Sequence, residues 1–312
     1  MEKTSKIIAT LQEVFYNSAG YINEPTKRLF YVYLLSSLAL AIFVYYRKKP
    51  KSSLFKYIFN KKTWWSSSAK IDYAFLFFNS LIKVLFIAPF LIFSLKIAFY
   101  LNQYLVDSFG YYEVRHSKTL LITLYTLAVF FIGDFASFFL HYLQHRIKFL
   151  WRFHKVHHAA TVLNPVTQYR IHPVELLLNN IKTILIIGAL MGIFEYFANG
   201  RISVYTFMGV NVINFAFLFF GANLRHSSVK LKYPNILEFI FISPFQHQIH
   251  HSNASEHFNK NLGSKLAIWD WLFGTLIHSK KVGKIKFGLG KEEDRKFVSF
   301  FGNLFEPFVF WK

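Results

Sequence analysis

Long apolar segments constrain the fold of this chain more than any other feature. Residues 29–46 carry no charge and, at 18 residues, are long enough to cross a bilayer core as a helix. Further apolar runs occupy residues 73–101, 119–140, 181–197 and 204–222. Backbone polar groups in lipid must be satisfied within the segment, so these runs predict helices. We therefore expect an all-α integral membrane protein with about five transmembrane helices.

Two of these runs need a more detailed interpretation. Residues 73–101 are too long for one upright span, and Lys83 and Pro89 interrupt them. We expect a short lead-in at the membrane surface and then a span near residues 84–101, with a possible kink at Pro89. Residues 181–222 predict a hairpin of two spans around a short turn.

Residues 1–27 lack the pattern of a cleaved signal peptide.

The charge distribution predicts the orientation of the chain. Formal net charge is +20, and the cations flank the apolar runs, as the positive-inside rule describes. Residues 47–70 contain eight basic side chains and no acidic one. We expect this loop, residues 141–180 and residues 223–312 together in the cytoplasm and the amino end outside. This pattern favours a membrane over a nucleic-acid partner.

Histidines cluster in two stretches, DFASFFLHYLQHRIKFLWRFHKVHH at 134–158 and FQHQIHH at 245–251. One pair is spaced i, i+4, and two triplets are spaced i, i+3, i+4, so each group can converge on one side of a helix. Neutral imidazole is the commonest nitrogen ligand of protein metals. The chain has no cysteine, so metals must be held by nitrogen and oxygen. Eight histidines exceed the need of one structural zinc and predict a two-metal site: His141, His145, His154, His157, His158, His247, His250 and His251.

Four more residues are candidates for supporting this site. Asp134 lies seven residues before His141, on nearly the same helix face, and we expect it to hold the second ring nitrogen of a ligand. His172 precedes a proline and is expected beside the ligands or facing substrate. His257 and Asn261 are expected in the surroundings of the site.

The histidine pattern, H-x3-H followed by two H-x2-HH triplets, resembles the fatty acid hydroxylase / sterol desaturase superfamily of membrane di-metal oxidases. The stretches DFASFFLHYLQHR, YRIHPVE, NKNLG and IWDWLFGT are similar to the same superfamily and favour its sterol desaturase-like branch. The resemblance covers roughly residues 125–280. It implies that His226 is a ninth ligand. The expected division is an N-terminal membrane region at 1–118, a catalytic domain at 119–280 and a peripheral cytoplasmic tail at 281–312.

The resemblance also implies two iron ions, although zinc can occupy such sites in preparations, and dioxygen as co-substrate. The chain contains no haem motif or flavin fingerprint, so a separate electron donor such as cytochrome b5 or a ferredoxin is expected. The expected location is a bacterial inner membrane or the endoplasmic reticulum. The substrate is a lipid of open identity (sterol, fatty acyl chain, sphingolipid, alkylglycerol or carotenoid), and the product is an alcohol or an alkene.

Two other functions use the same residues. Zinc in the histidine frame would activate water and make a membrane hydrolase, although the HExxH motif of many such enzymes is absent from this sequence. A metal or ion carrier would place histidines along the spans, whereas here they lie at span ends. Both readings are weaker than the oxidase.

Overall fold

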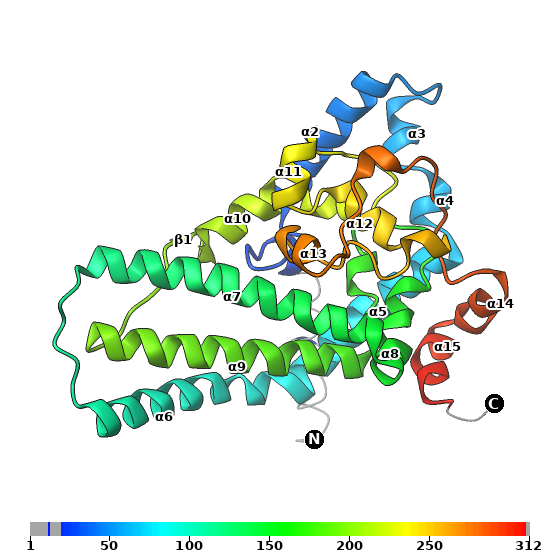
Figure 1. The fold of residues 1–312 in the computed structure, drawn as a ribbon. Coiled ribbons are helices and arrows are strands. Elements are labelled where there is room, and N and C mark those ends of the chain that lie inside the picture. Colours follow the sequence, from blue (N-terminus) through cyan, green and yellow to red (C-terminus); the bar gives the residue numbers. More distant parts are fainter. Residues whose placement is uncertain (1–11, 13–19, 310–312) are drawn as a thin grey trace.

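The computed structural model describes residues 12 and 20–309 of the 312-residue chain. These described residues are mostly helical and contain one two-stranded hairpin. Three long helices lie side by side, and a cap of short helices and loops covers one end of this bundle (Figure 1). The predicted absence of a signal peptide in residues 1–27 concerns residues that lie mostly outside the described part.

The bundle consists of α6 (Ile92–Phe109), α7 (Lys118–Arg146) and α9 (Pro173–Ala198), with α9 between the other two (Figure 1). Two glycines of α9 let it approach α6 closely. A Cβ at Gly192 would lie 2.6 Å from the carbonyl oxygen of Ala98, and one at Gly188 would lie 2.7 Å from that of Ser94. Small residues at such contacts are typical of helices that pack within a membrane.

Three stretches of the described residues are long and apolar enough to cross a membrane: Ser67–Phe109, Lys118–Arg146 and Pro173–Ala198. The helix α2 (Tyr31–Lys48) forms where a first span was predicted but is not among them. The run at 204–222 differs more from its prediction. It forms the hairpin β1 (Thr206–Phe207) and β2 (Val210–Asn211), then α10 (Val212–Phe219), whose eight residues rise only about 12 Å.

The stretch before the bundle is interrupted where the sequence indicated. Helix α5 (Ser67–Ile82) passes into one π-helical turn, η2 (Lys83–Ile87), and one 3-10 turn, η3 (Ala88–Phe90), before α6 begins. Pro89 lies in the 3-10 turn, because proline lacks an N–H and cannot continue the regular helix. The lead-in is longer than predicted, and α6 begins at Ile92 rather than near residue 84.

The cap is built from short elements. Its α-helices are α3 (Leu54–Ile58), α4 (Lys61–Trp64), α8 (Lys148–His158), α11 (Asn235–Ile240), α12 (Pro244–His250), α13 (Ile268–Leu272), α14 (Lys291–Asp294) and α15 (Phe300–Phe305). Its 3-10 turns are η1 (Gly20–Ile22), η4 (Thr167–Tyr169), η5 (Ala222–Arg225), η6 (Ser255–His257), η7 (Ser279–Lys281), η8 (Arg295–Phe297) and η9 (Glu306–Phe308).

The carboxyl-terminal segment is part of the cap, which corrects the expectation of a peripheral tail. Asn303 of α15 is fully buried, and its Oδ1 accepts hydrogen bonds from Arg170 Nη2 at 2.7 Å and Nε at 3.2 Å. Arg170 also forms a buried ion pair with Asp72 of α5, at 3.5 Å. A buried guanidinium needs several acceptors, and the tail supplies one of them.

This contact predicts that the tail stabilises the cap. Replacing Asn303 with leucine (N303L) removes one buried acceptor of the Arg170 guanidinium, which should cost about 1–3 kcal/mol. Thermal unfolding of the purified protein in detergent should show a lower midpoint. The exposed neighbour substitution F301L is the control and should leave the midpoint unchanged. Equal midpoints for N303L and the wild type would show that the tail is peripheral after all.

Candidate metal centre

Nine histidines converge at the end of the bundle in two groups, and within each group the ring nitrogens lie within 4.8 Å of one another. The first group is His141, His145, His154, His158 and His250. The second group is His157, His226, His247 and His251. These are the nine residues that the sequence analysis named as ligands, brought together from α7, α8, the end of η5 and α12.

The two H-x2-HH triplets each contribute to both groups. On α8, His154 and His158 face the first group while His157 faces the second. On α12, which begins with a Ser243–Gln246 capping box, His250 joins the first group and His247 and His251 the second. Each triplet therefore bridges the two positions, and the arrangement suits two neighbouring ions better than one.

Backbone carbonyls of a single loop orient two histidine rings of the first group. His141 Nδ1 lies 2.7 Å from the carbonyl oxygen of Leu262, and His250 Nδ1 lies 2.9 Å from that of Lys260. A carbonyl can only accept a hydrogen bond, so both Nδ1 atoms carry the proton. The unprotonated Nε2 atoms are then left for a metal, as is usual for histidine ligands.

The YRIHPVE stretch orients two rings of α8 in the same way. His157 Nδ1 donates to the carbonyl oxygen of Arg170 at 3.2 Å, and His154 Nδ1 donates to Glu175 Oε1 at 3.0 Å. Glu175 lies in the first turn of α9. A carboxylate behind a ligand histidine fixes its tautomer and increases its basicity.

The loop that carries Lys260 and Leu262 is itself held rigidly by the WDWLFGT stretch. The buried Asp270 carboxylate accepts hydrogen bonds from the N–H groups of Leu262 and Gly263, both at 2.7 Å. Any side chain at Gly263 would collide, because a Cβ there would lie 2.6 Å from the carbonyl oxygen of Leu266. NKNLG and WDWLFGT therefore form one supporting unit for the histidines.

The distances between ring nitrogens test whether a metal fits. His141 Nε2 and His154 Nε2 are 3.0 Å apart, and His158 Nε2 is 3.2 Å from His154 Nε2. The first two are both lone-pair atoms, since their Nδ1 atoms carry the protons, so they repel unless a cation lies between them. Two ligands each about 2.1 Å from one ion, at a right angle, are about 3.0 Å apart. The nitrogen set therefore fits a metal ion.

Two further observations support the same fit. The buried Nε2 atoms of His145 and His250 have no hydrogen-bond partner in this structure, and a metal would satisfy both. Burial lowers the pKa of His154 and of His157 to about 3, with the neighbouring His154 adding to the effect on His157. These imidazoles are therefore neutral near pH 7 and offer their lone pairs.

His247 departs from this pattern. Arg225 Nη2 lies 3.2 Å from His247 Nδ1, and a guanidinium can only donate. Neutral His247 therefore carries its proton on Nε2, which points toward His226 Nε2 at 3.1 Å. Metal binding through this nitrogen requires loss of that proton or movement of Arg225.

Asp134 does not hold a ligand histidine, contrary to the sequence prediction. Its Oδ2 accepts hydrogen bonds from the N–H of Leu266 and from Trp269 Nε1, both at 3.0 Å, and its Oδ1 lies 3.5 Å from Lys265 Nζ. The seven-residue spacing placed Asp134 on the same helix face as His141, but two turns are too far for its carboxylate to reach the ring. Asp134 instead anchors the segment before α13.

His172, His257 and Asn261 lie outside the two groups. His172 Nδ1 accepts from the N–H of Val174 and caps α9, and its Nε2 lies 3.0 Å from the carbonyl oxygen of Leu304. His257 is buried in η6. Asn261 has a positive φ of 54°, and its amide bonds the backbone of Gln246 and Ile277, so it supports the loop rather than a ligand. The backbone carbonyls that accept hydrogen bonds from the histidine rings could not be predicted from the sequence, because every residue has a carbonyl.

Two cavities reach the histidines from different sides. One of about 460 Å³ meets His141, His154, His157, His226 and His247 between α7, α9 and residues 26–28. Another of about 360 Å³ meets His145, His158 and His250 near Trp151 and Lys155. The first is also lined by several cations that sequence analysis did not single out, among them Arg28, Lys182 and Arg225.

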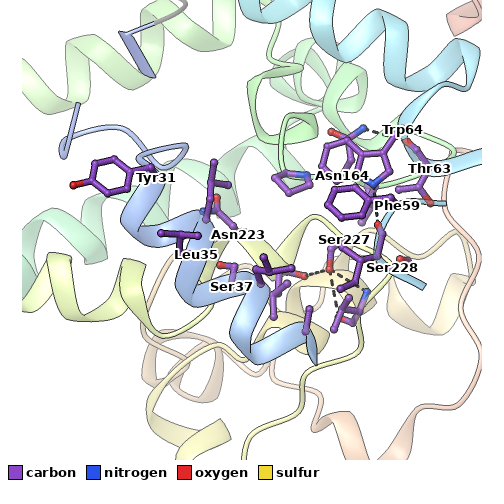
Figure 2. Close-up of a pocket in the computed structure, with 18 residues that line it drawn as sticks. Tyr31, Leu35, Ser37, Phe59, Thr63, Trp64, Asn164, Asn223, Ser227 and Ser228 are labelled. Atoms are coloured by element: carbon purple, nitrogen blue, oxygen red, sulfur yellow. Dashed lines mark hydrogen bonds between the residues drawn. The ribbon is translucent and has the colours of Figure 1, made fainter. Parts of the chain in front are cut away.

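A third cavity, of about 410 Å³, is apolar and lies between α2 and the cap. Figure 2 shows Tyr31 and Leu35 of α2 on one side, Phe59 and Trp64 on another, and Asn223 in the wall. The Asn223 Oδ1 accepts from Gln168 Nε2 at 3.3 Å, and Gln168 lines the 460 Å³ cavity. This hydrogen bond thus joins a residue that lines the apolar cavity to one that lines the cavity at the histidines.

Comparison with known proteins agrees with this geometry. Residues 126–275 match the family model described as fatty acid hydroxylase, and this range includes all nine histidines. The chain is 28% identical over 177 residues to ornithine lipid hydroxylase OlsE of Rhizobium tropici, a match covering 57% of this chain and 48% of the relative. No solved structure matches. The chain thus spans about half the length of this curated relative. Residues 126–275 are thus similar to the fatty acid hydroxylase family.

Proposed function

We propose that this protein is a membrane lipid hydroxylase that uses dioxygen, and that its nine histidines hold two iron ions. The observation that carries the proposal is the partition of the histidines into two groups that share α8 and α12. The family match and the lipid hydroxylase relative support lipid hydroxylation. An all-imidazole set suits iron, and bound iron would supply the oxidising chemistry.

In that reaction, residues around the centre orient the histidine rings. Glu175 and the carbonyls of residues 170, 260 and 262 hold the rings with Nε2 inward. The burial of the histidines excludes bulk water from the centre, which protects a reactive oxidant from side reactions. The two cavities provide separate routes to the two groups, one for the lipid and one for dioxygen.

Hydroxylation rather than desaturation is proposed because the curated relative is named a hydroxylase. The sterol desaturase-like branch remains a prediction from the flanking motifs. Dioxygen accepts four electrons on reduction to water, and one C–H bond supplies two as it becomes C–OH. The other two must come from a separate donor of the cytochrome b5 or ferredoxin type.

The proposed placement is a bacterial inner membrane or the endoplasmic reticulum, with the cap in the cytoplasm. The support is the basic character of residues 47–70 beside the cap, together with the three candidate spans. Neither α2 nor α10 is among the three candidate spans. The proposal of five spans therefore requires that both of these helices lie in the membrane.

Metal content should depend on residues far apart in the sequence. His145 and His250 belong to the same group, so H145A and H250A should each lower bound metal by about one ion per chain. Elemental analysis of the purified variants measures this. The exposed His116, changed in H116A, is the control and should keep full content. Full occupancy in both test variants would remove the proposed site.

Product formation should need dioxygen, iron and a reductant together. An assay in nanodiscs with an added donor should give no product under strict anoxia, and label from heavy dioxygen should appear in the product. A zinc hydrolase would need neither oxygen nor donor, since zinc has no redox chemistry. Product formed without oxygen, with zinc bound, would favour the hydrolase instead.

Side-specific labelling tests the orientation. The chain has no cysteine, so single cysteines can be introduced without background. The exposed positions Ser67 and Ser255 lie at the cap, and Tyr111 lies in the loop between α6 and α7 at the other end of the bundle. An impermeant thiol reagent should label S67C and S255C from the cytoplasmic side and Y111C from the other. Labelling of all three from one side would contradict the proposal.

A further inference from the structure

The 460 Å³ cavity at the histidines is lined by an excess of positive charge. Among the described residues that line it, Glu175 is the one carboxylate, and it is hydrogen-bonded to His154. The basic residues come from the segment before α2, from η2, α9 and η5: Lys27, Arg28, Lys83, Lys182 and Arg225. A cavity of this kind attracts anions, because low-dielectric walls strengthen the field of the cations.

Two of these cations have hydroxyl groups as partners in the described structure. Lys182 Nζ donates to Ser137 Oγ at 2.8 Å, and Lys83 Nζ lies 3.4 Å from the hydroxyl of Tyr21. Among the described residues, none of the five basic side chains forms an ion pair. By contrast, Lys155 in the 360 Å³ cavity pairs with Glu293 at 3.3 Å. Partly buried cations that form no direct ion pair are costly, which suits a site completed by an anionic ligand.

Arg225 provides a second, independent observation. Its side chain is only 2% exposed, and its terminal nitrogens donate to the carbonyl oxygens of Gly263 and Ser264 and to His247. Its buried Nε has no partner in this structure. A guanidinium held rigidly at the wall of the cavity, with an unused donor, is typical of a site that binds carboxylate or phosphate.

The cations lie close to the metal centre. Ser137, the partner of Lys182, precedes His141 by one turn of α7, a rise of about 6 Å. Lys182 and Ser137 also lie within candidate spans, on the bundle side of the histidines. An anion bound at Lys182 would therefore be held at the junction of bundle and cap, about one helical turn from a ligand ring.

We propose that this cavity binds the anionic headgroup of the lipid substrate, a phosphate or a carboxylate, through Arg28, Lys182 and Arg225. The C–H bond that is oxidised then lies within about one helical turn's length of that group, rather than far along an acyl chain. This inference rests on the proposed function for its reaction, but the binding step does not. None of the described residues that line the apolar cavity beside Asn223 is charged, so headgroup selection falls to the basic cavity.

Binding of short-chain probes to the purified full chain in neutral detergent tests this. Dioctanoyl phosphatidylglycerol and N-octanoyl glycine carry the two anionic groups, dioctanoyl phosphatidylcholine is the zwitterionic comparison, and sodium phosphate is the free anion. We expect at least one anionic probe to bind about tenfold or more tightly than phosphatidylcholine, with binding weakened by salt. Phosphate alone should compete only weakly.

Variants assign the effect to this cavity. K182M and R28M should each weaken the anionic probe by about tenfold and leave phosphatidylcholine binding unchanged, whereas K182R should keep the affinity. The exposed Lys70, changed in K70M, is the matched control. Equal binding of all lipids, unchanged affinity in both K182M and R28M, or phosphate binding as tightly as the lipid would each overturn the proposal. Metal content, measured on the same samples, reports separately on the proposed function.

Discussion

The centre depends on hydrogen bonds that fix which ring nitrogen carries a proton. Carbonyl oxygens of Leu262, Lys260 and Arg170 accept from Nδ1 of three histidines, and Glu175 accepts from a fourth. Each bond turns a lone pair inward, and several inward lone pairs at about 3 Å repel one another unless a cation is present. The fold therefore holds the rings in an arrangement that metal ions would stabilise. Asp270 and Gly263 fix the loop that carries Lys260 and Leu262.

Helical spacing is a local property, so the convergence of the clustered histidines could be predicted from the sequence. The i, i+3, i+4 triplets of α8 and α12 converge for the reason their spacing indicated, and family resemblance added His226. Their division between two groups depends on how α8, α12 and η5 pack, and spacing says nothing about that. Backbone carbonyl partners also leave no trace in residue identity. Asp134 shows the limit of face arguments, since it shares a face with His141 but bonds α13.

Membrane spans predicted from hydrophobicity were less accurate where a turn or a capping residue interrupts an apolar run. The apolar run at 204–222 is interrupted by a hairpin, and Asn211 caps a helix of only eight residues. The carboxyl-terminal segment looked peripheral from its composition, yet one buried asparagine ties it to Arg170 and Asp72. The basic cavity was missed for a related reason. Its cations come from four separate elements, and in the sequence they were indistinguishable from positive-inside residues.

The most direct test of this account is anomalous diffraction at the iron edge from crystals of the protein purified with its native metal. We predict two peaks, one among His141, His145, His154, His158 and His250 and the other among His157, His226, His247 and His251, each about 2.1 Å from its ring nitrogens. A single peak, or metal bound outside these groups, would contradict the central claim that the histidines form a two-iron centre.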